Sequence, residues 1–366
     1  MKFAVLGKND AALALTADLA LRGFPVALYC DTSERGHELL HSPSFTCLSE
    51  AAGFHEGAGL YQVENFAVAE SPAQAVADAD IVYLVSSPHD HEAVLAECGA
   101  AVRDDAVLVL PQSGVGGALV AAAVLQCQGK AGVAVAQISA PHTVRPTESA
   151  TIRVTKKKDR VPLGVLPACR TEEVLARLAP VFPQYYPVSN VLAAGMTRVG
   201  MALHPIPVIM GAIKIEQLGR YQYDAYDITP AVARVIEAAD RERRALLEAL
   251  GLEAPSFVEL LGRSFGAKGE SFYEAVHDIQ AYKNSFSPDS VNTRYITDDV
   301  PTQVVPMVEL AAALGVRTPV FDAVIAFSDA MLGTSMRETG WNLTRLGLAN
   351  RDGAQILGYL RDGPAR

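Results

Sequence analysis

The feature that most constrains the fold is a series of short, largely apolar segments early in the chain, each ending in small or turn-forming residues. They are residues 2–6, 26–29, 81–85, 106–110 and 133–136. Continuous apolar runs of this kind are typical of strands in a parallel sheet that is covered on both faces. A helical pattern through Ala11, Leu15 and Leu19 joins the first two segments into a βαβ unit. The sequence therefore predicts an N-terminal Rossmann-like α/β domain with a doubly wound, mostly parallel sheet.

The turn after the first segment is the expected place for a dinucleotide, because such sheets bind ligands at the carboxyl ends of their strands. From Gly7 it reads Gly-Lys-Asn-Asp-Ala-Ala, so only the first glycine of G-x-G-x-x-G is present. Asn9 tolerates a left-handed backbone and Ala12 permits close helix–strand contact, so we expect Gly7, Asn9 and Ala12 to bind the cofactor. Asp10 is harder to explain, because a carboxylate repels a pyrophosphate. Asp31, after the second segment, is expected to bind a ribose hydroxyl, which favours NADH over NADPH.

Polar side chains also follow the later segments of the expected sheet. Ser87 comes after residues 81–85, Gln112 comes after 106–110, and His142 and Thr143 follow 133–136. We expect Ser87 to contact the cofactor, and Gln112, His142 and Thr143 to contact the substrates. The alternative for each of them is ordinary loop chemistry.

The pattern changes after residue 150. Residues 152–155 and 161–166 are strand-like and enclose a basic run, which predicts a hairpin with a solvated turn. Helical patterns dominate later, notably over 230–250, 301–314 and 320–332. We therefore expect a dinucleotide-binding domain over 1–188 and a mainly α-helical substrate and catalytic domain over 189–366.

Length and composition exclude several classes of protein. The 366 residues exceed what one core usually serves, and the net charge of −10 disfavours nucleic acid or an anionic membrane as a partner. The five cysteines stand singly and the histidines lack metal-ligand spacing, so we expect reduced thiols, a cytoplasmic protein and no metal. No apolar run is long enough to suggest a membrane span. Small molecules are the expected partners, and a homodimer is left open.

One histidine and one carboxylate suit proton transfer. His204 lies in the apolar run 201–210, where a histidine is ordinarily a hydrogen-bonded core residue. A ring that titrates near neutral pH also suits a general acid or base, provided that a carboxylate orients it. Asp299 is a candidate for that carboxylate, although a carboxylate at the start of a helix commonly serves as a cap.

The run 294–301, Arg-Tyr-Ile-Thr-Asp-Asp-Val-Pro, resembles the C-terminal signature of the octopine/nopaline (opine) dehydrogenase family. The resemblance extends to 161–167, to His204-Pro205 and to 229–237, and so covers essentially the whole chain. It implies a Rossmann domain that binds NAD(P)H and an α-helical domain that closes over it. It also implies reductive condensation of an amino acid's amine with a 2-oxo acid such as pyruvate.

By the same resemblance, His204 matches the catalytic histidine and Asp299 its carboxylate partner. Arg294 matches an arginine that meets the cofactor pyrophosphate on closure, and its fork geometry also suits a substrate carboxylate. The sequence departs from the family at the glycine turn and lacks an asparagine usually found shortly before the histidine. Two other functions remain open: an NAD(P)-dependent reductase of 2-oxo acids or ketones without an amine, and a non-catalytic nucleotide-binding regulator.

Overall fold

The computed structural model describes residues 1–30, 34–111, 113–145, 151–283 and 285–363, which divide into two compact units. The sheet unit comprises Met1–Ser113, Ala118–Val191 and the chain from Arg361 on. The helical unit comprises Gly114–Gly117 and Leu192–Leu360. The units thus divide after Val191, whereas the domain prediction divides the chain after residue 188. Residues 114–117 group with the helical unit, where the Val115 N–H donates to the Thr302 carbonyl at 2.9 Å.

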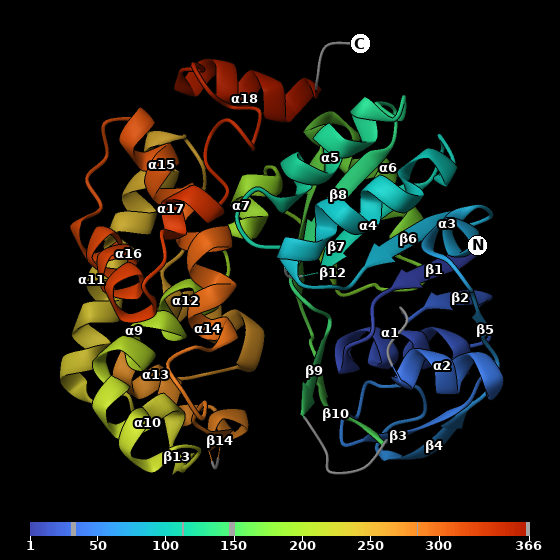
Figure 1. The fold of residues 1–366 in the computed structure, drawn as a ribbon, viewed down its shortest axis with the longest axis horizontal. Helices are drawn as coiled ribbons and strands as arrows, with labels where there is room; N and C mark the ends of the chain where they lie inside the picture. Colours follow the sequence, from blue (N-terminus) through green and yellow to red (C-terminus); the bar gives the residue numbers. More distant parts are fainter. Residues whose placement is uncertain (31–33, 112, 146–150, 284, 364–366) are drawn as a thin grey trace. The chain divides into compact units, whose positions relative to one another are not determined.

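An eight-stranded sheet forms the centre of the sheet unit, in the order β12-β11-β8-β7-β6-β1-β2-β5 (Figure 1). Its strands are β1 (Phe3–Leu6), β2 (Val26–Tyr29), β5 (Ala67–Val68), β6 (Ile81–Leu84), β7 (Val107–Pro111), β8 (Ala134–Ile138), β11 (Val161–Leu166) and β12 (Tyr185–Pro187). All neighbours pair in parallel except β8 and β11. Every residue of β1 and β6 is buried, as apolar strands in a doubly covered sheet should be. The predicted fold class is confirmed.

In the described part of the sheet unit, α-helices lie between successive strands. They are α1 (Asp10–Leu21), α2 (Glu34–His41), α3 (Pro72–Val76), α4 (His91–Cys98), α5 (Gly117–Cys127) and α6 (Thr171–Leu178). Helix α1 contacts β1 and β2, and α6 contacts β11 and β12. The helical pattern read between the first two apolar segments is therefore α1, which places its N-terminus at the carboxyl end of β1.

The predicted hairpin is wrong, because one of its two strands lies in a second sheet. It has the order β4-β3-β10-β9 and contains β3 (Phe45–Ser49), β4 (Gly59–Val63), β9 (His142–Arg145) and β10 (Ile152–Lys157). Strand β10 pairs with β9 and β3, whereas β11 pairs with β8 and β12 in the large sheet. The two predicted hairpin strands thus belong to different sheets. The basic run between them is also not wholly solvated, because Lys157 Nζ lies 2.8 Å from buried Asp18.

The helical unit is built from short helices around one long one. Its helices are α7 (Val191–Gly195), α8 (Gly200–Leu203), α9 (Pro205–Met210), α10 (Ala212–Leu218), α11 (Pro230–Ala249), α12 (Phe257–Phe265), α13 (Phe272–Asp278), α14 (Arg294–Thr297), the π-helix η6 (Val300–Val304), α15 (Val305–Ala313), α16 (Pro319–Leu332), α17 (Met336–Thr339) and α18 (Gly353–Asp362). Two short strands, β13 (Gln222–Tyr223) and β14 (Ser285–Phe286), pair antiparallel. Both α11 and α16 begin with proline, where the missing N–H needs no partner.

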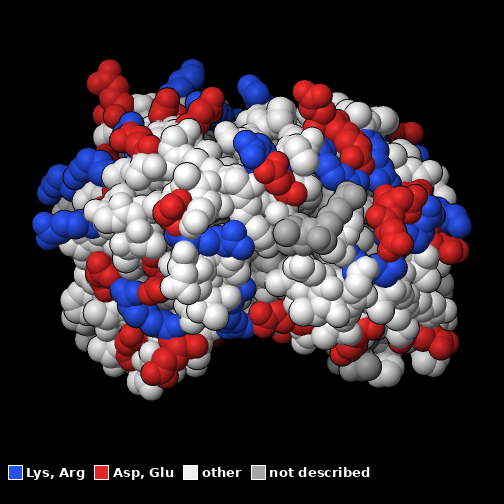
Figure 2. Space-filling view, turned by 90° about the horizontal axis from the view of Figure 1, so that it is seen from above, with Lys and Arg blue, Asp and Glu red and all other residues white. Residues whose placement is uncertain are grey.

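Charged side chains of both signs are interspersed on the face of the molecule that Figure 2 shows. The described residues on that face therefore present no broad cationic surface. Within the described parts of the chain, no helix is both long and apolar enough to cross a bilayer.

Candidate active site

The structure brings His204 and Asp299 together, although 95 residues separate them in the chain. His204 stands between α8 and α9, at the break that Pro205 makes in the helical run. Its Nδ1 lies 2.7 Å from Asp299 Oδ2. No described residue is hydrogen-bonded to its Nε2, and His204 lines a cavity of the helical unit. The carboxylate thus fixes one ring nitrogen and leaves the other available to a ligand.

Asp299 is held on its other oxygen as well. It is 3% exposed, and its Oδ1 accepts a hydrogen bond from Gln303 Nε2 and lies 3.9 Å from the Arg198 guanidinium. Burial alone would raise the pKa of Asp299, but the charge and hydrogen bond of His204, together with Arg198 and Arg294, outweigh burial and hold that pKa below its usual value. Asp299 is therefore ionised and presents a negative charge to the His204 ring.

A π-helix turn positions this carboxylate. Asp299 precedes η6, in which the Val305 N–H donates to the Val300 carbonyl, five residues back. The wider turn leaves two carbonyls to outside donors: Pro301 accepts from the Trp341 N–H at 3.0 Å, and Thr302 accepts from Val115. Single π-turns of this kind occur often at functional sites.

Two tyrosine rings lie against the histidine ring, and a third tyrosine is hydrogen-bonded to one of them. Tyr295 stacks on His204 with ring centroids 4.3 Å apart, and the Tyr226 ring lies 6.0 Å away. Hydrogen bonds link the Tyr295 hydroxyl to those of Tyr223 and Tyr226, and burial raises the pKa of Tyr295. A Cβ added to Gly200 would lie only 3.0 Å from His204 Cε1. The ring is therefore closely packed by Tyr295 and by the Gly200 backbone.

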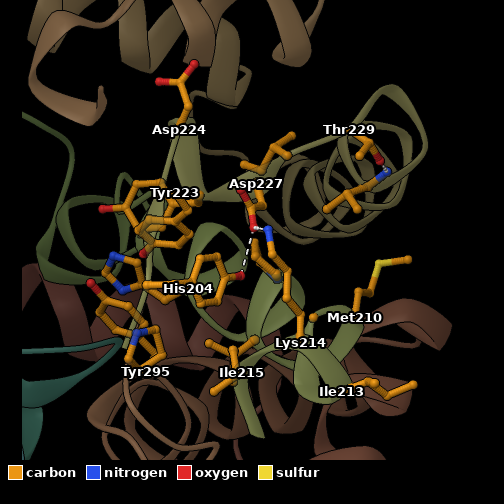
Figure 3. A pocket seen from close by; sticks show the side chains of 18 of the residues that line it. His204, Met210, Ile213, Lys214, Ile215, Tyr223, Asp224, Asp227, Thr229 and Tyr295 are labelled. Atoms are coloured by element: carbon orange, nitrogen blue, oxygen red, sulfur yellow. Dashed lines mark hydrogen bonds and ion pairs between the residues drawn. The ribbon is translucent and has the colours of Figure 1, made fainter. Parts of the chain in front are cut away.

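The cavity beside His204 has a volume of about 850 Å³ and lies wholly within the helical unit. Figure 3 shows His204 and Tyr295 at one end of it and Met210 and Ile213 at the other. Most of its lining side chains are aliphatic or aromatic. An apolar cavity with a few convergent polar groups is the usual form of a small-molecule site.

Arg294 is the first residue of α14 and is exposed. Its guanidinium makes no hydrogen bond to any described residue. It is nevertheless near enough to Asp299 to lower the pKa of that carboxylate. Arg294 therefore presents a cation to solvent close to the His204–Asp299 pair.

The turn after β1 packs closely against the residue that follows β6. A Cβ on Gly7 would lie 2.3 Å from the Val85 carbonyl oxygen, so no other residue fits there. Asn9 does not adopt the left-handed backbone that asparagine tolerates. Its backbone is extended, with φ −82° and ψ 166°. Its Oδ1 caps α1 by accepting from the Ala12 N–H, and its Nδ2 donates to Val85. Asp10, unexplained in the sequence, pairs with Arg35 at 2.9 Å, so its charge is compensated.

A cavity of about 260 Å³ opens at this turn, lined by Gly7 and Ser86 among others. The Ser86 hydroxyl is buried and hydrogen-bonded to no described residue. A buried hydroxyl without a partner, a glycine cradle and the N-terminus of α1 together fit the phosphates and ribose of a dinucleotide. Ser87, which we expected to contact the cofactor, follows Ser86 and is half-buried.

Two of the predicted substrate residues, His142 and Thr143, belong to the second sheet of the sheet unit. His142 is buried, with Nε2 at 3.0 Å from Asp18 Oδ2 and its ring edge-on to Phe54. Thr143 pairs with β10 in the second sheet. We therefore assign His142 a structural role and leave it out of the proposed site. Gln112 and Asp31 lie outside the described residues.

Sequence reasoning missed several members of the His204 site. Arg198 and Gln303 reach Asp299 only because a proline break and a π-turn bring three segments together. Tyr226 approaches His204 from a left-handed turn. Tyr295 carried a usable signal, since it is an aromatic residue within the charged run 294–299.

Comparisons with known proteins identify the family of this chain. The family of NAD/NADP octopine/nopaline dehydrogenases matches residues 187–332 through its α-helical domain. The opine dehydrogenase of Arthrobacter sp. (strain 1C) is 31% identical over 97% of this chain and 97% of its own length.

Solved structures show the same fold. Octopine dehydrogenase with NADH and L-arginine matches with a TM-score of 0.77 at 17% identity, over 100% of this chain and 99% of that one. Yersinopine dehydrogenase with bound NADP⁺ matches with a TM-score of 0.72 at 18% identity, over 99% and 98%. The predicted family and the predicted NAD or NADP cofactor are confirmed. This chain belongs to the octopine/nopaline (opine) dehydrogenase family and is an NAD(P)-dependent dehydrogenase.

Proposed function

We propose that this chain condenses the amine of an amino acid with a 2-oxo acid such as pyruvate and reduces the product with NADH or NADPH. The observation that carries the proposal is the buried His204–Asp299 pair with a free ring nitrogen at the end of an apolar cavity. Octopine dehydrogenase has been solved with L-arginine and with pyruvate, which supports this pair of substrate classes.

The reaction needs proton transfers that a histidine can make near neutral pH. Neutral His204 accepts a proton from the ammonium group, so that the free amine attacks the carbonyl carbon. The resulting imidazolium returns the proton to the carbinolamine oxygen, which leaves as water. Asp299 stabilises the imidazolium and holds the ring by Nδ1, as the carboxylate of a catalytic triad does.

Other residues bind and orient. The nicotinamide cofactor supplies the hydride that reduces the carbon–nitrogen double bond. Gly7 and the first turn of α1 hold the pyrophosphate, and Ser86 offers a hydroxyl to the same ligand. Arg294 binds an anion, either a substrate carboxylate or the pyrophosphate, through paired N–H groups.

The test follows NADH and NADPH oxidation with pyruvate, 2-oxoglutarate or glyoxylate, each with and without a panel of amino acids. The proposal expects oxidation to depend on both co-substrates. Equal rates with and without an amine would identify the chain as a 2-oxo acid reductase.

A further inference from the structure

We propose that the amine substrate is an amino acid with an uncharged, apolar side chain, and that the Lys214–Asp227 ion pair excludes charged ones. The inference deepens the proposed function and rests on it. It concerns the part of the cavity beyond His204, where the side chain of a bound amino acid would lie if its amine approached the His204 ring.

Two opposite charges in this cavity, Lys214 and Asp227, pair with each other. Lys214 Nζ lies 2.5 Å from Asp227 Oδ2, and the Tyr221 hydroxyl donates to the same oxygen at 2.7 Å. The Lys214 ammonium also lies 4.2 Å from the centre of the Tyr221 ring. Figure 3 shows the Lys214–Asp227 contact inside the cavity, and shows the Asp224 carboxylate pointing away from His204.

A charged substrate side chain would meet a like charge at this pair. A guanidinium at Asp227 would lie beside the Lys214 ammonium, whether it displaced Lys214 from Oδ2 or used Oδ1, which is hydrogen-bonded to no described residue. A carboxylate at Lys214 would meet Asp227 with the signs reversed. Either ion would face a repulsion that an uncharged side chain does not.

The remaining walls favour apolar groups. Met210, Ile213 and Leu218 line the cavity and are 53%, 76% and 59% exposed, although side chains of this size are usually buried. An aliphatic or aromatic substrate side chain would remove part of this surface from water. Exposed apolar groups that line a cavity commonly mark a ligand-binding surface.

Asp227 of the ion pair belongs to a backbone turn with an unusual conformation. Ala225, Tyr226 and Asp227 have φ values of 43°, 62° and 55°, a left-handed conformation that non-glycine residues rarely adopt in succession. Such strain persists only where the surroundings impose it, and it gathers at ligand sites. Here the Asp227 contacts with Lys214 and Tyr221 tie down one end of the turn, and this places Tyr226 beside the His204 ring.

The experiment measures kcat/KM with NADH and pyruvate for L-leucine, L-phenylalanine, L-arginine, L-lysine and L-glutamate. We expect leucine or phenylalanine to exceed arginine and glutamate by at least about ten-fold. Two variants of the ion pair should then shift selectivity in opposite directions. Lys214→Met frees the carboxylate and should raise the arginine-to-leucine ratio about ten-fold, whereas Asp227→Asn frees the ammonium and should raise the glutamate-to-leucine ratio.

Lys268→Met is the matched control, because Lys268 is exposed and lies outside the cavity, and its ratios should equal those of the wild type. Thermal melting and NADH titration confirm that each variant is folded. Preference of the wild type for arginine or glutamate would overturn the inference and leave the proposed function standing. The inference would also be overturned if Lys214→Met lost the same fraction of kcat/KM with every amine, because Lys214 would then bind the carboxylate that all amino acids share. Absence of amine-dependent oxidation with every amino acid would instead overturn the proposed function.

Discussion

At the scale of single residues, the chemistry depends on a histidine whose two nitrogens have different surroundings. Nδ1 of His204 is bound to a carboxylate that is buried, ionised and held on both oxygens. Nε2 has no partner among the described residues, and the ring borders a cavity. One ring nitrogen is thus fixed by a carboxylate and the other is open to a ligand, as a general acid or base requires.

We predict that His204→Ala and Asp299→Asn each lower kcat by roughly 100- to 10,000-fold, the usual contribution of general acid–base catalysis. NADH affinity should change by no more than a few-fold, because the dinucleotide turn belongs to the sheet unit. Steady-state kinetics and NADH fluorescence titration measure the two effects. Asp289→Asn, at an exposed position of the helical unit, is the matched control. Full turnover in the histidine variant would remove His204 from the mechanism.

The preference between NADH and NADPH is also predicted from single side chains. We expect NADH to bind more tightly than NADPH, because the Asp31 carboxylate would repel a 2′-phosphate. Arg35 lies two residues beyond the segment 31–33 and pairs with Asp10, so its charge is already engaged. Fluorescence titration of both reduced cofactors measures the preference. Tighter NADPH binding, lost in Arg35→Ala, would show that Arg35 and not Asp31 sets the choice.

At the scale of secondary-structure elements, a buried ion cluster joins α1 to the second sheet. Asp18 on α1 accepts from His142 on β9 at 3.0 Å and from Lys157 on β10 at 2.8 Å. Burial alone would raise the pKa of Asp18, but His142 and Lys157 outweigh it and lower that pKa to about 2. The cluster connects the dinucleotide-binding helix to strands more than a hundred residues away in sequence.

The cluster gives a prediction about acid stability. Because the folded pKa of Asp18 lies below the unfolded value, its contribution is complete above about pH 4 and is lost as the pH falls towards about 2. Asp18→Asn should therefore destabilise the protein by roughly 3 to 5 kcal/mol at neutral pH. Urea unfolding at about pH 6 and about pH 3 measures this, and the gap between wild type and variant should narrow at the lower pH. If the difference in unfolding free energy between wild type and Asp18→Asn did not change with pH, ionisation of Asp18 would not account for the destabilisation.

The elements differ in how far the sequence predicts them. The strands of the large sheet are predictable because burial on both faces leaves a continuous apolar run, as in residues 81–85. The pattern over 152–155 also predicts strand β10, but not its pairing, because the parallel partner β3 lies about a hundred residues earlier and leaves no local signal. The left-handed turn at 225–227 contains no glycine, so the sequence gives no indication of it.

The candidate site shows the same limit. His204 can be found as a lone polar residue in an apolar run, and the family resemblance names Asp299. Gln303 and Arg198 cannot be found, because their contacts with Asp299 depend on a π-turn and a helix break. Residues that act through long-range packing leave no periodic pattern.

At the scale of the whole molecule, we expect cofactor binding to be coupled to motion of the two units. Arg294 belongs to the helical unit, Gly7 to the sheet unit, and the family resemblance implies that Arg294 meets the pyrophosphate on closure. A charge-assisted hydrogen bond contributes about 1.5 to 3 kcal/mol, which is enough to shift an equilibrium between open and closed forms. NADH should therefore lower the radius of gyration measured by small-angle scattering. Arg294→Ala should abolish the change, and Arg317→Ala, at another exposed arginine of the helical unit, should keep it. The same compaction in Arg294→Ala would assign Arg294 to the substrate carboxylate.

The central claim is that this chain joins an amine to a 2-oxo acid by means of the His204–Asp299 pair. The most direct test incubates the enzyme with NADH, pyruvate and L-leucine and measures the product by mass spectrometry. The account predicts a secondary amine whose mass equals leucine plus pyruvic acid less one oxygen atom, formed with one NADH oxidised per molecule and greatly reduced in His204→Ala. Lactate as the sole product, at a rate that does not depend on any of the amino acids tested, would contradict it.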